Sequence, residues 1–330
     1  MTAAGDPEAR FLGQEVLITG GAGFIGSHLV DRLLAEGARV TVVDDLRAGR
    51  SENLRHCVDE IEHVKEDVTS ESFSALVASR PFQCVFHLAG NPFVPPSVER
   101  PWFDFEANLV GTLRLLEGLR RAGRKNRALV WSSAAVYGEV DSGSITEDTP
   151  TVPISPYGVS KLAADRYVAV YARMYGLAVA SLRPFSVYGP RQRKQVVYDF
   201  MRKLGASPAE VQALGDGTQM RDFVYVSDMV DAAMTVACRG RLGGETYNVA
   251  SERSWTIREL LETIGALMGV SPQVRWSGEV RPGEPQRWFA DASRLRTLGW
   301  APNVTLTEGL RRTVTWYRQE LRKAPCGTTA

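Results

Sequence analysis

The chain has 330 residues, of which 44% are hydrophobic and 23% charged, and its formal net charge is +1. This balance excludes a strongly basic surface for nucleic acid or an anionic membrane, and no apolar run approaches the roughly 18–20 residues of a membrane span. Four scattered cysteines without C-x-x-C spacing indicate neither a disulfide framework nor a zinc site, so we expect no metal. The polar N-terminus lacks the apolar centre of a secretory signal, which favours a cytoplasmic protein.

The first predicted element is a strand over Val16–Thr19, followed by a glycine turn and a helix over Ser27–Glu36. The turn spaces Gly20, Gly23 and Gly26 as G-x-x-G-x-x-G. Glycines can simply punctuate a turn, but the strand and helix around them are typical of a dinucleotide fingerprint. In that fingerprint the glycines permit a tight turn, close approach of a pyrophosphate and close packing of the helix on the strand. Free N–H groups at the helix start then receive the phosphates.

The second predicted strand, Val40–Val43, ends at Asp44, about twenty residues past the glycines. A carboxylate there can accept both adenosine ribose hydroxyls and would repel a 2′-phosphate, which favours NAD over NADP. The structural alternative is a simple turn residue, and Arg47 and Arg50 keep NADP open. Asp67 ends a third strand candidate, where it could hold the adenine amino group or lie in a surface turn.

The predicted catalytic residues follow a buried strand over Ala128–Ser132. Ser133 follows that strand, and a hydroxyl at the carboxyl end of such a strand lies at the ligand crevice of an open α/β sheet. Tyr157 and Lys161 are four residues apart on one face of a helix predicted over Tyr157–Tyr175. We expect the nearby Lys161 ammonium, together with the positive nicotinamide ring of a bound cofactor, to lower the pKa of the phenol, which would make Tyr157 a usable acid and base.

Strands alternate with helices through the first half of the chain. Further strands are expected over Val85–Leu88 and Leu177–Leu182, and a further helix over Phe105–Ala122. This alternation predicts an α/β fold with a Rossmann-type, doubly wound parallel sheet. We divide the chain into a flexible N-terminal tail (1–12), an NAD-binding domain (13–185), a smaller mixed α/β lobe for substrate (186–323) partly threaded back into the first, and a flexible C-terminal tail (324–330).

Together these features resemble the extended short-chain dehydrogenases/reductases, and within them the nucleotide-sugar epimerase group. The resemblance extends from Val16 to about Trp316. The matching stretches are TGGAGFIGSHL from Thr19, FHLAG from Phe86, NLVGT from Asn108, SSAAVYG from Ser132, SPYGVSK from Ser155, RPFSVYGPRQ from Arg183, GDGTQMRDFVYVSD from Gly215, YNVAS from Tyr247, and RPGE from Arg281 with FAD at Phe289.

The resemblance implies a role for each matching residue. The implied catalytic triad is Ser133, Tyr157 and Lys161. The residues implied to bind NAD are Gly20, Gly23, Phe24, Ile25, Gly26, Asp44, Asp67, Val68, Leu88, Ala89, Asn108, Tyr157 and Lys161. The residues implied to bind a nucleotide-diphosphate sugar are Ser133, Tyr157, Ser186, Val197, Leu214, Arg221, Arg281, Glu284 and Trp288.

Four of these substrate positions carry specific expectations from the family. Arg221 and Arg281 fall where the family clamps the diphosphate, and Glu284 falls where a carboxylate binds the nucleotide ribose. Trp288 falls at the wall of the sugar pocket, where a bulky residue excludes N-acetylated sugars. The structural alternatives are solvated surface arginines and a core aromatic residue.

The chain also departs from the family pattern. Ala134 and Ala135 replace the acidic residues that dehydratases and decarboxylases of the family carry after the catalytic hydroxyl. Ser186 replaces an asparagine usual in 4-epimerases, and the segment Gln195–Phe200 is atypical beside the nucleotide. Asp199 in that segment could pair with a guanine edge, so the base stays open although a UDP-sugar is favoured.

The resemblance therefore implies an NAD-dependent nucleotide-sugar epimerase that acts at C4 through a transient 4-keto sugar. The alternatives are a nucleotide-4-keto-sugar reductase, an epimerase at C2, C3 or C5, and a non-catalytic protein that senses NAD(P). The helices predicted over Phe105–Ala122 and Tyr157–Tyr175 have apolar residues beyond the stripe that faces the sheet. In the family this pair forms a four-helix contact, so we expect a homodimer.

Overall fold

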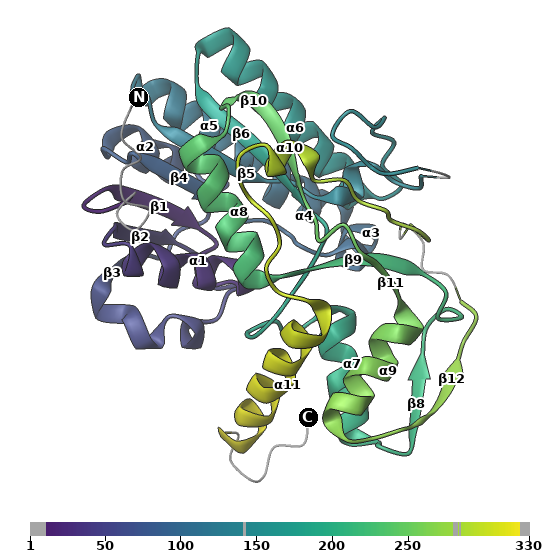
Figure 1. Ribbon diagram of the computed structural model, residues 1–330. Helices are drawn as coiled ribbons and strands as arrows, with labels where there is room; N and C mark the ends of the chain where they lie inside the picture. The colour runs from purple at the N-terminus through teal and green to yellow at the C-terminus, as the bar shows by residue number, and fades with distance from the viewer. Residues whose placement is uncertain (1–10, 141–142, 280–282, 284, 324–330) are drawn as a thin grey trace.

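A seven-stranded sheet forms the centre of the computed structural model, which describes residues 11–140, 143–279, 283 and 285–323. The strand order is β10-β6-β5-β4-β1-β2-β3, and every neighbouring pair is parallel (Figure 1). The strands are β1 (Glu15–Thr19), β2 (Arg39–Val43), β3 (Ile61–Val64), β4 (Cys84–His87), β5 (Arg127–Trp131), β6 (Ala178–Pro184) and β10 (Gly243–Val249). Their apolar runs are buried because helices cover both faces of a parallel sheet.

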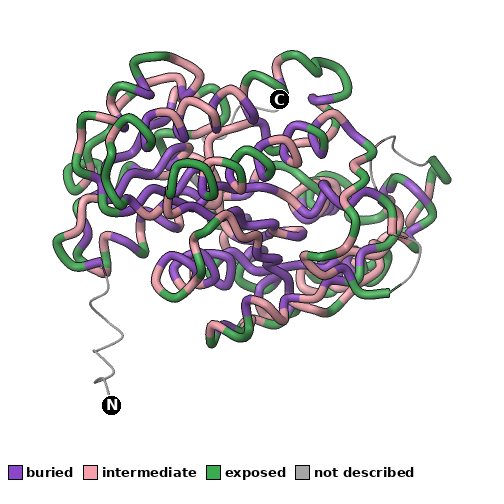
Figure 2. Tube along the Cα trace, turned by 90° about the horizontal axis from the view of Figure 1, so that it is seen from above, coloured by how far each residue is buried: buried purple, intermediate pink, exposed green. Residues whose placement is uncertain are grey.

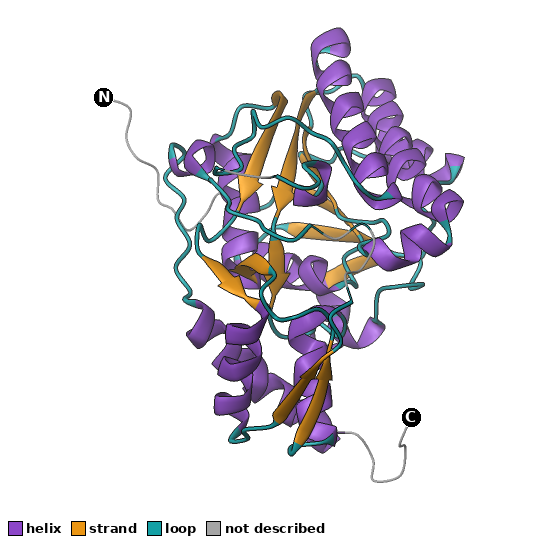
Figure 3. Cartoon of the chain, turned by 90° about the vertical axis from the view of Figure 1, so that its right-hand side faces the viewer, coloured by secondary structure: helices purple, strands orange, loops and turns teal. Residues whose placement is uncertain are grey.

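Helices flank the sheet on both sides (Figure 3). On one face α1 (Phe24–Ala35) packs against α8 (Val226–Arg239), which also contacts β5. On the other face α2 (Glu71–Ser79), α5 (Gly111–Ala122) and α6 (Pro156–Tyr175) pack against one another in sequence. The two faces hold separate clusters of buried apolar side chains. In Figure 2 the buried residues run through the middle of the molecule, between exposed rims.

A smaller lobe lies beside the carboxyl ends of these strands (Figure 1). It contains a three-stranded sheet in the order β11-β9-β7 and a two-stranded sheet of β12 and β8. Its strands are β7 (Ser186–Tyr188), β8 (Glu210–Ala213), β9 (Met220–Tyr225), β11 (Ser254–Thr256) and β12 (Gln273–Trp276). Its helices are α7 (Gln195–Ala206), α9 (Ile257–Met268) and α11 (Leu306–Lys323), and the short α10 (Ser293–Arg296) contacts β10 of the main sheet.

The smaller lobe is not a separate stretch of chain. After residue 186 the chain returns to the main sheet, because α8 packs on α1 and β10 pairs with β6. The α/β fold with a Rossmann-type sheet and a smaller lobe is confirmed.

The expected N-terminal tail, residues 1–12, extends too far along the chain. Phe11 falls inside the expected tail, yet its side chain is fully buried and its ring centroid lies 6.2 Å from that of Phe86. The guanidinium of Arg127 packs over the same ring. Because Phe11 is buried, the boundary at residue 12 is wrong. The sequence did not indicate this burial, since Phe11 is a single aromatic residue in a polar segment. The C-terminal segment 324–330 lies outside the described residues.

The helix expected over Phe105–Ala122 is interrupted. The short helices α3 (Val94–Glu99) and α4 (Pro101–Phe105) precede a π turn over Glu106–Val110, and α5 follows directly. Single π turns occur often at functional sites. This one carries Asn108, a residue implied to bind the cofactor.

Candidate active site

The glycine turn forms a cradle at the switch point of the sheet, where β1 lies between β2 and β4. Gly20 has φ +71°, and a Cβ there would lie 2.8 Å from the Ala89 nitrogen. A Cβ on Gly26 would lie 2.2 Å from the Gly20 carbonyl oxygen, so only glycine lets α1 lie this close to the turn. Gly23 is the N-cap of α1 and supplies no capping side chain. The first amides of α1, beginning at Phe24 and Ile25, are therefore available to phosphates.

Asp44 lies directly after β2 and is buried. Its Oδ2 accepts a hydrogen bond from the Ala22 amide and its Oδ1 one from the Leu46 amide, both at 2.9 Å. Burial raises the pKa of this carboxyl, while the two amide hydrogen bonds oppose that effect. The carboxylate is thus held in place beside the glycine turn, as a ribose-binding group requires.

The basic residues that kept NADP open are engaged elsewhere. The guanidinium of Arg47 pairs with the carboxylates of Asp45 and Asp67. That of Arg50 lies 3.6 Å from Glu52. Because neighbouring carboxylates already compensate both charges, the arginines do not form a free site for a 2′-phosphate. The arrangement therefore fits NAD.

The remaining adenine-side positions lie around the same edge of the sheet. Asp67 lies three residues beyond β3 rather than at its end, and its Oδ1 accepts from the amide and the hydroxyl of Thr69. Val68 is buried against Gly111 at the start of α5. Leu88 and Ala89 directly follow β4, and the Ala89 amide donates to the Thr19 hydroxyl at 3.2 Å.

Asn108 is buried on the π turn, and its side-chain amide donates to Asp104 and to Ser160. Its Oδ1 has no hydrogen-bond partner among the described residues. A buried acceptor without a partner is costly, and a bound ligand can satisfy it. The cradle, the uncapped helix, Asp44 and this free acceptor all fit a dinucleotide.

Ser133, Tyr157 and Lys161 are brought together by close packing of α6 on the segment after β5. Ser133 is the N-cap of a short 3-10 helix, Ala134–Val136. A Cβ on Gly158 would lie 2.6 Å from the Ala135 carbonyl oxygen, so this glycine permits the close approach. The Lys161 Nζ lies 5.9 Å from the centroid of the Tyr157 ring and donates to the Trp131 carbonyl at 2.9 Å.

The pKa of Tyr157 differs from our expectation. Burial raises the pKa of this phenol to about 12, and a hydrogen bond from Ser133 only partly opposes that effect. Burial also lowers the pKa of Lys161 to about 8. The expected lowering therefore does not hold in the protein alone. Desolvation is the largest cause of the raised pKa, and a bound positive charge, such as the expected nicotinamide ring, is needed to bring the pKa of the phenol toward neutral pH.

Apart from Ser133 and Tyr157, the expected substrate residues that the structure describes lie in the smaller lobe or at its border. Arg221 lies on β9, and its guanidinium packs over the indole of Trp288 at 5.4 Å. Trp288 is only 8% exposed, its indole N–H donates to the Gly138 carbonyl at 3.4 Å, and its ring packs edge-on against Phe185. The indole is thus partly a core residue, and it also supports the implied diphosphate arginine.

The other substrate positions differ in exposure. Ser186 begins β7 and is half-buried, and Leu214 is 38% exposed just after β8. Val197 on α7 is buried in the apolar core, so its side chain packs inside the lobe. Arg281 and Glu284 lie outside the described residues.

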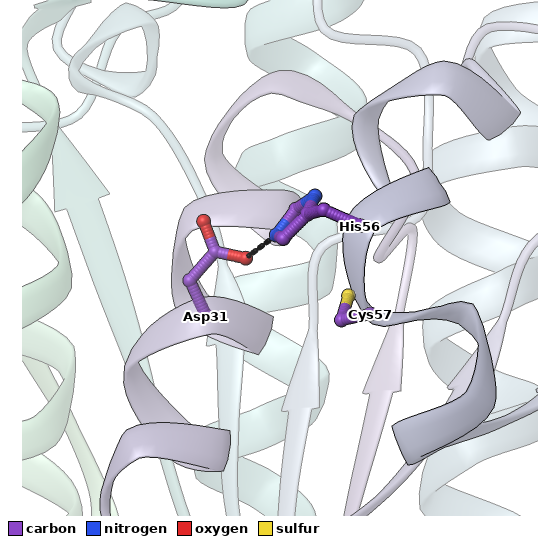
Figure 4. Close-up of side chains that lie close together, drawn as sticks. All are labelled: Asp31, His56 and Cys57. Atoms are coloured by element: carbon purple, nitrogen blue, oxygen red, sulfur yellow. Dashed lines mark hydrogen bonds and ion pairs between the residues drawn. The ribbon is translucent and has the colours of Figure 1, made fainter.

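A group of possible metal ligands lies away from the triad. Figure 4 shows Asp31 of α1 beside His56 and Cys57 of a 3-10 helix over Arg55–Glu60. Their potential ligand atoms lie within 4.8 Å of one another. The His56 Nε2 lies 2.8 Å from one Asp31 oxygen, and Arg191 pairs with the other at 2.7 Å. Because a guanidinium already neutralises the carboxylate, we assign no metal to this group.

The cofactor cradle beside a Ser–Tyr–Lys group defines an enzyme of the short-chain dehydrogenase/reductase class. The chain belongs to the family described as GDP-mannose 4,6 dehydratase, whose model matches residues 17–313. This membership confirms the expected extended family. Among the helices that the structure describes, none is long and apolar enough to cross a membrane.

Individual relatives are similar over nearly the whole chain. A UDP-glucose 4-epimerase of Mycolicibacterium smegmatis is 38% identical over 311 residues, which cover 92% of this chain and 98% of the relative. The solved UDP-glucose 4-epimerase of Thermotoga maritima with UDP-glucose is 35% identical with a TM-score of 0.86, and the match covers 93% of this chain and all of that one. A Thermus thermophilus UDP-glucose 4-epimerase in complex with NAD is 37% identical with a TM-score of 0.84, covering 92% and 99%. NAD is therefore the cofactor of the present protein, as a member of this family.

Sequence reasoning missed three buried polar residues behind the triad, namely Asn91, Asp104 and Ser160. One signal was available: Asp104 precedes Asn108 by four residues, a spacing that brings two side chains together on a helix. The predicted helix begins at Phe105, one residue after Asp104, and therefore does not contain the pair.

Proposed function

We propose that this protein is an NAD-dependent nucleotide-sugar epimerase that inverts C4 of the sugar. The observation that carries this proposal is the Ser133–Tyr157–Lys161 group beside a complete dinucleotide cradle, with Ala134 and Ala135 where dehydratases carry acidic residues. Both alanines are buried, and neither can act as an acid or base. Oxidation at C4 is therefore supported, whereas elimination of water lacks its catalytic group.

The residues of the triad have distinct tasks. Tyr157 takes the proton of the sugar 4-hydroxyl and returns it when the hydroxyl is re-formed. Ser133 hydrogen-bonds the phenol and is placed to hold the same sugar oxygen. Lys161 supplies a fixed positive charge that favours the ionised phenol. When bound, NAD supplies the acceptor and donor of the C4 hydride.

The substrate is a UDP-sugar in this proposal. The support is that relatives similar over more than nine tenths of this chain are named as UDP-glucose 4-epimerases. Arg221 is the described candidate for the diphosphate, because a guanidinium can bind two phosphate oxygens at once. For the sugar to invert, it must turn about its diphosphate linkage between Arg221 and Tyr157.

The decisive experiment incubates the purified protein with UDP-glucose, UDP-galactose and their GDP and dTDP counterparts, with products identified by NMR. We expect interconversion of the two UDP-hexoses with no net change in NADH. Formation of a 4-keto-6-deoxy sugar would instead identify a dehydratase. Stoichiometric consumption of NADH with a 4-keto substrate would identify the reductase alternative.

A homodimer is the second part of the proposal. Four residues on one face of α6 are exposed, namely Val159, Tyr167, Val170 and Met174. Beside them a cavity of about 650 Å³ lies between α4 and the start of α6, with apolar walls that include Phe105 and Ile154. A contiguous exposed apolar surface of this kind favours self-association. A monomeric mass by light scattering at micromolar concentration would contradict it.

A further inference from the structure

A buried carboxylate outside the triad, that of Asp104, lies behind Tyr157 and Lys161. Asp104 is on α4 and is fully buried. Its Oδ1 accepts hydrogen bonds from the amides of Asn91 at 2.7 Å and Asn108 at 2.9 Å, and its Oδ2 accepts one from the Ser160 hydroxyl at 2.6 Å. All three donors are neutral. No described lysine, arginine or histidine forms an ion pair with Asp104, and a buried charge without a cation partner is costly.

The other buried carboxylate near the triad is in a different situation. Asp165, four residues after Lys161 on α6, pairs with the guanidinium of Arg183 at 2.9 Å. Both members of that pair are almost fully buried, so the charge of Asp165 is largely compensated. Asp104 is thus the uncompensated negative charge in this part of the core.

Lys161 shows the complementary imbalance. Its ammonium is buried, and the hydrogen-bond acceptor found for it is the neutral carbonyl of Trp131. The groups that face it are Asp104 from α4, Asp165 and Tyr157 from α6, and His87 from β4, whose pKa burial lowers to about 3 and which is therefore neutral. The charged residues on the packed α3 and π turn, Glu99 and Glu106, are exposed, as is Arg100 between α3 and α4.

We propose that Asp104 is a positioning residue whose buried negative charge keeps the Lys161 ammonium protonated and whose hydrogen bonds hold Asn108 and Ser160 beside the catalytic pair. The role of Asp104 in catalysis rests on the proposed function, whereas the arrangement of charges around it does not. Among the described residues, no hydrogen bond or ion pair is found between Asp104 and the phenol or the ammonium, so Asp104 acts on both groups through its charge.

The sign of the effect follows from the charge. Burial lowers the pKa of Lys161, and Asp104 is the first of the two carboxylates that oppose this. Asp104 also raises the pKa of Tyr157. Because Asp104 raises the pKa of both groups, removal of its negative charge lowers both pKa values of this Tyr157–Lys161 pair. A rate that needs one proton on the pair then keeps its bell shape, but the bell moves to lower pH.

The test variant is Asp104→Asn, which removes the charge and keeps the shape. The Ser160 hydroxyl can donate to the Tyr157 carbonyl at 3.0 Å instead, which leaves its oxygen free to accept from the new amide. In NAD-loaded protein, we expect both limbs of the kcat/KM profile to move to lower pH by roughly half a unit to one unit. Asp104→Ala, in which water can reach the two asparagine amides, provides a second neutral variant should the first fail to fold.

Two controls separate charge from structure. Asp104→Glu keeps the charge and should leave both limbs in place even if kcat falls. Ser160→Ala removes one hydrogen bond and keeps the charge, so it should lower kcat without moving either limb. If the folded neutral variants keep both limbs within about 0.2 pH units of the wild type, Asp104 has only a structural role and the proposal is overturned.

A readout independent of turnover distinguishes this proposal from the proposed function. Tyrosinate absorbance, measured as the difference between each protein and its Tyr157→Phe counterpart, reports the titration of Tyr157 directly. We expect the pKa of Tyr157 reported by this absorbance to fall in Asp104→Asn whether or not any nucleotide sugar is turned over. An unchanged titration refutes the inference about Asp104, whereas a lowered titration in a protein without epimerase activity refutes only the proposed function.

Discussion

Replacement of Tyr157 by phenylalanine is the most direct test of the proposed chemistry. The change removes one oxygen atom and keeps the buried ring at the start of α6. The phenol is buried, and the group found to hydrogen-bond it is the Ser133 hydroxyl. Loss of one such bond costs about 0.5–1.5 kcal/mol of stability, so the variant should remain folded.

The expected loss of activity follows from the state of the phenol. With the pKa of Tyr157 at about 12, only about one phenol in ten thousand is ionised near pH 8 in the protein alone. A bound positive charge must therefore favour the ionised form by several kcal/mol for Tyr157 to act as a base, because the pKa of about 12 already holds with Lys161 in place. Phenylalanine cannot move a proton at all. Loss of such a transfer lowers kcat by about 10²–10⁴-fold, or roughly 3–5 kcal/mol in the barrier.

The assay measures kcat for interconversion of UDP-glucose and UDP-galactose in NAD-loaded protein, with NAD binding measured in parallel. Tyr188→Phe is the matched control, because that buried hydroxyl donates to the Leu306 carbonyl and lies on the side of α11. The control should retain near wild-type kcat. If Tyr157→Phe binds NAD and keeps kcat within about threefold of the wild type, Tyr157 is not the acid and base.

Four further outcomes are expected. Ser133→Ala should lower kcat less than Tyr157→Phe, because the phenol can still reach the sugar hydroxyl, and an equal loss would contradict this order. Asp44→Ala should weaken NAD binding and raise the NADP/NAD affinity ratio, and equal binding of both cofactors by the wild type would contradict the role of Asp44. Burial lowers the pKa of His87 to about 3 from 6.5, so unfolding takes up a proton below pH 6.5. The free energy of unfolding should therefore fall by about 2 kcal/mol between about pH 8 and pH 5. His87→Gln should flatten this pH dependence in urea titrations, and an unchanged slope would exclude His87 as its cause. Trp288 should make kcat/KM for UDP-N-acetylglucosamine roughly ten- to a hundredfold lower than for UDP-glucose, and equal values would remove it as a size filter.

Much of the fold could be predicted because its signals are local. Buried β-branched runs such as Val40–Val43 and the glycine turn before α1 are determined by neighbours in the sequence. The interruption at Glu106–Val110 was not visible, because a π turn leaves the helical pattern of apolar residues almost unchanged. Phe11 was missed for a related reason, since one aromatic residue in a polar segment shows no periodicity.

The same distinction between local signals and features of the folded chain applies to the candidate site. The triad and the cradle follow motifs whose spacing is set by one helix or one turn, so the sequence places them well. The ionisation of Tyr157 depends on how deeply α6 is buried, which no local pattern reports. The three partners of Asp104 come from a loop after β4, the π turn and α6, and only the folded chain brings them together.

Trp288 shows how a motif can give the position of a residue and leave its task open. Its indole N–H donates to the carbonyl of Gly138, in the segment that follows Ser133, while its ring supports the guanidinium of Arg221. One side chain thus contacts both the segment that carries the catalytic hydroxyl and the implied diphosphate site. Replacement by serine would leave a large cavity beside Phe185 as well as a wider pocket, and cavities of this kind cost about 3–5 kcal/mol. The comparison of two sugars in the wild-type protein is therefore the sharper test of substrate size, because it changes the ligand and leaves this contact intact.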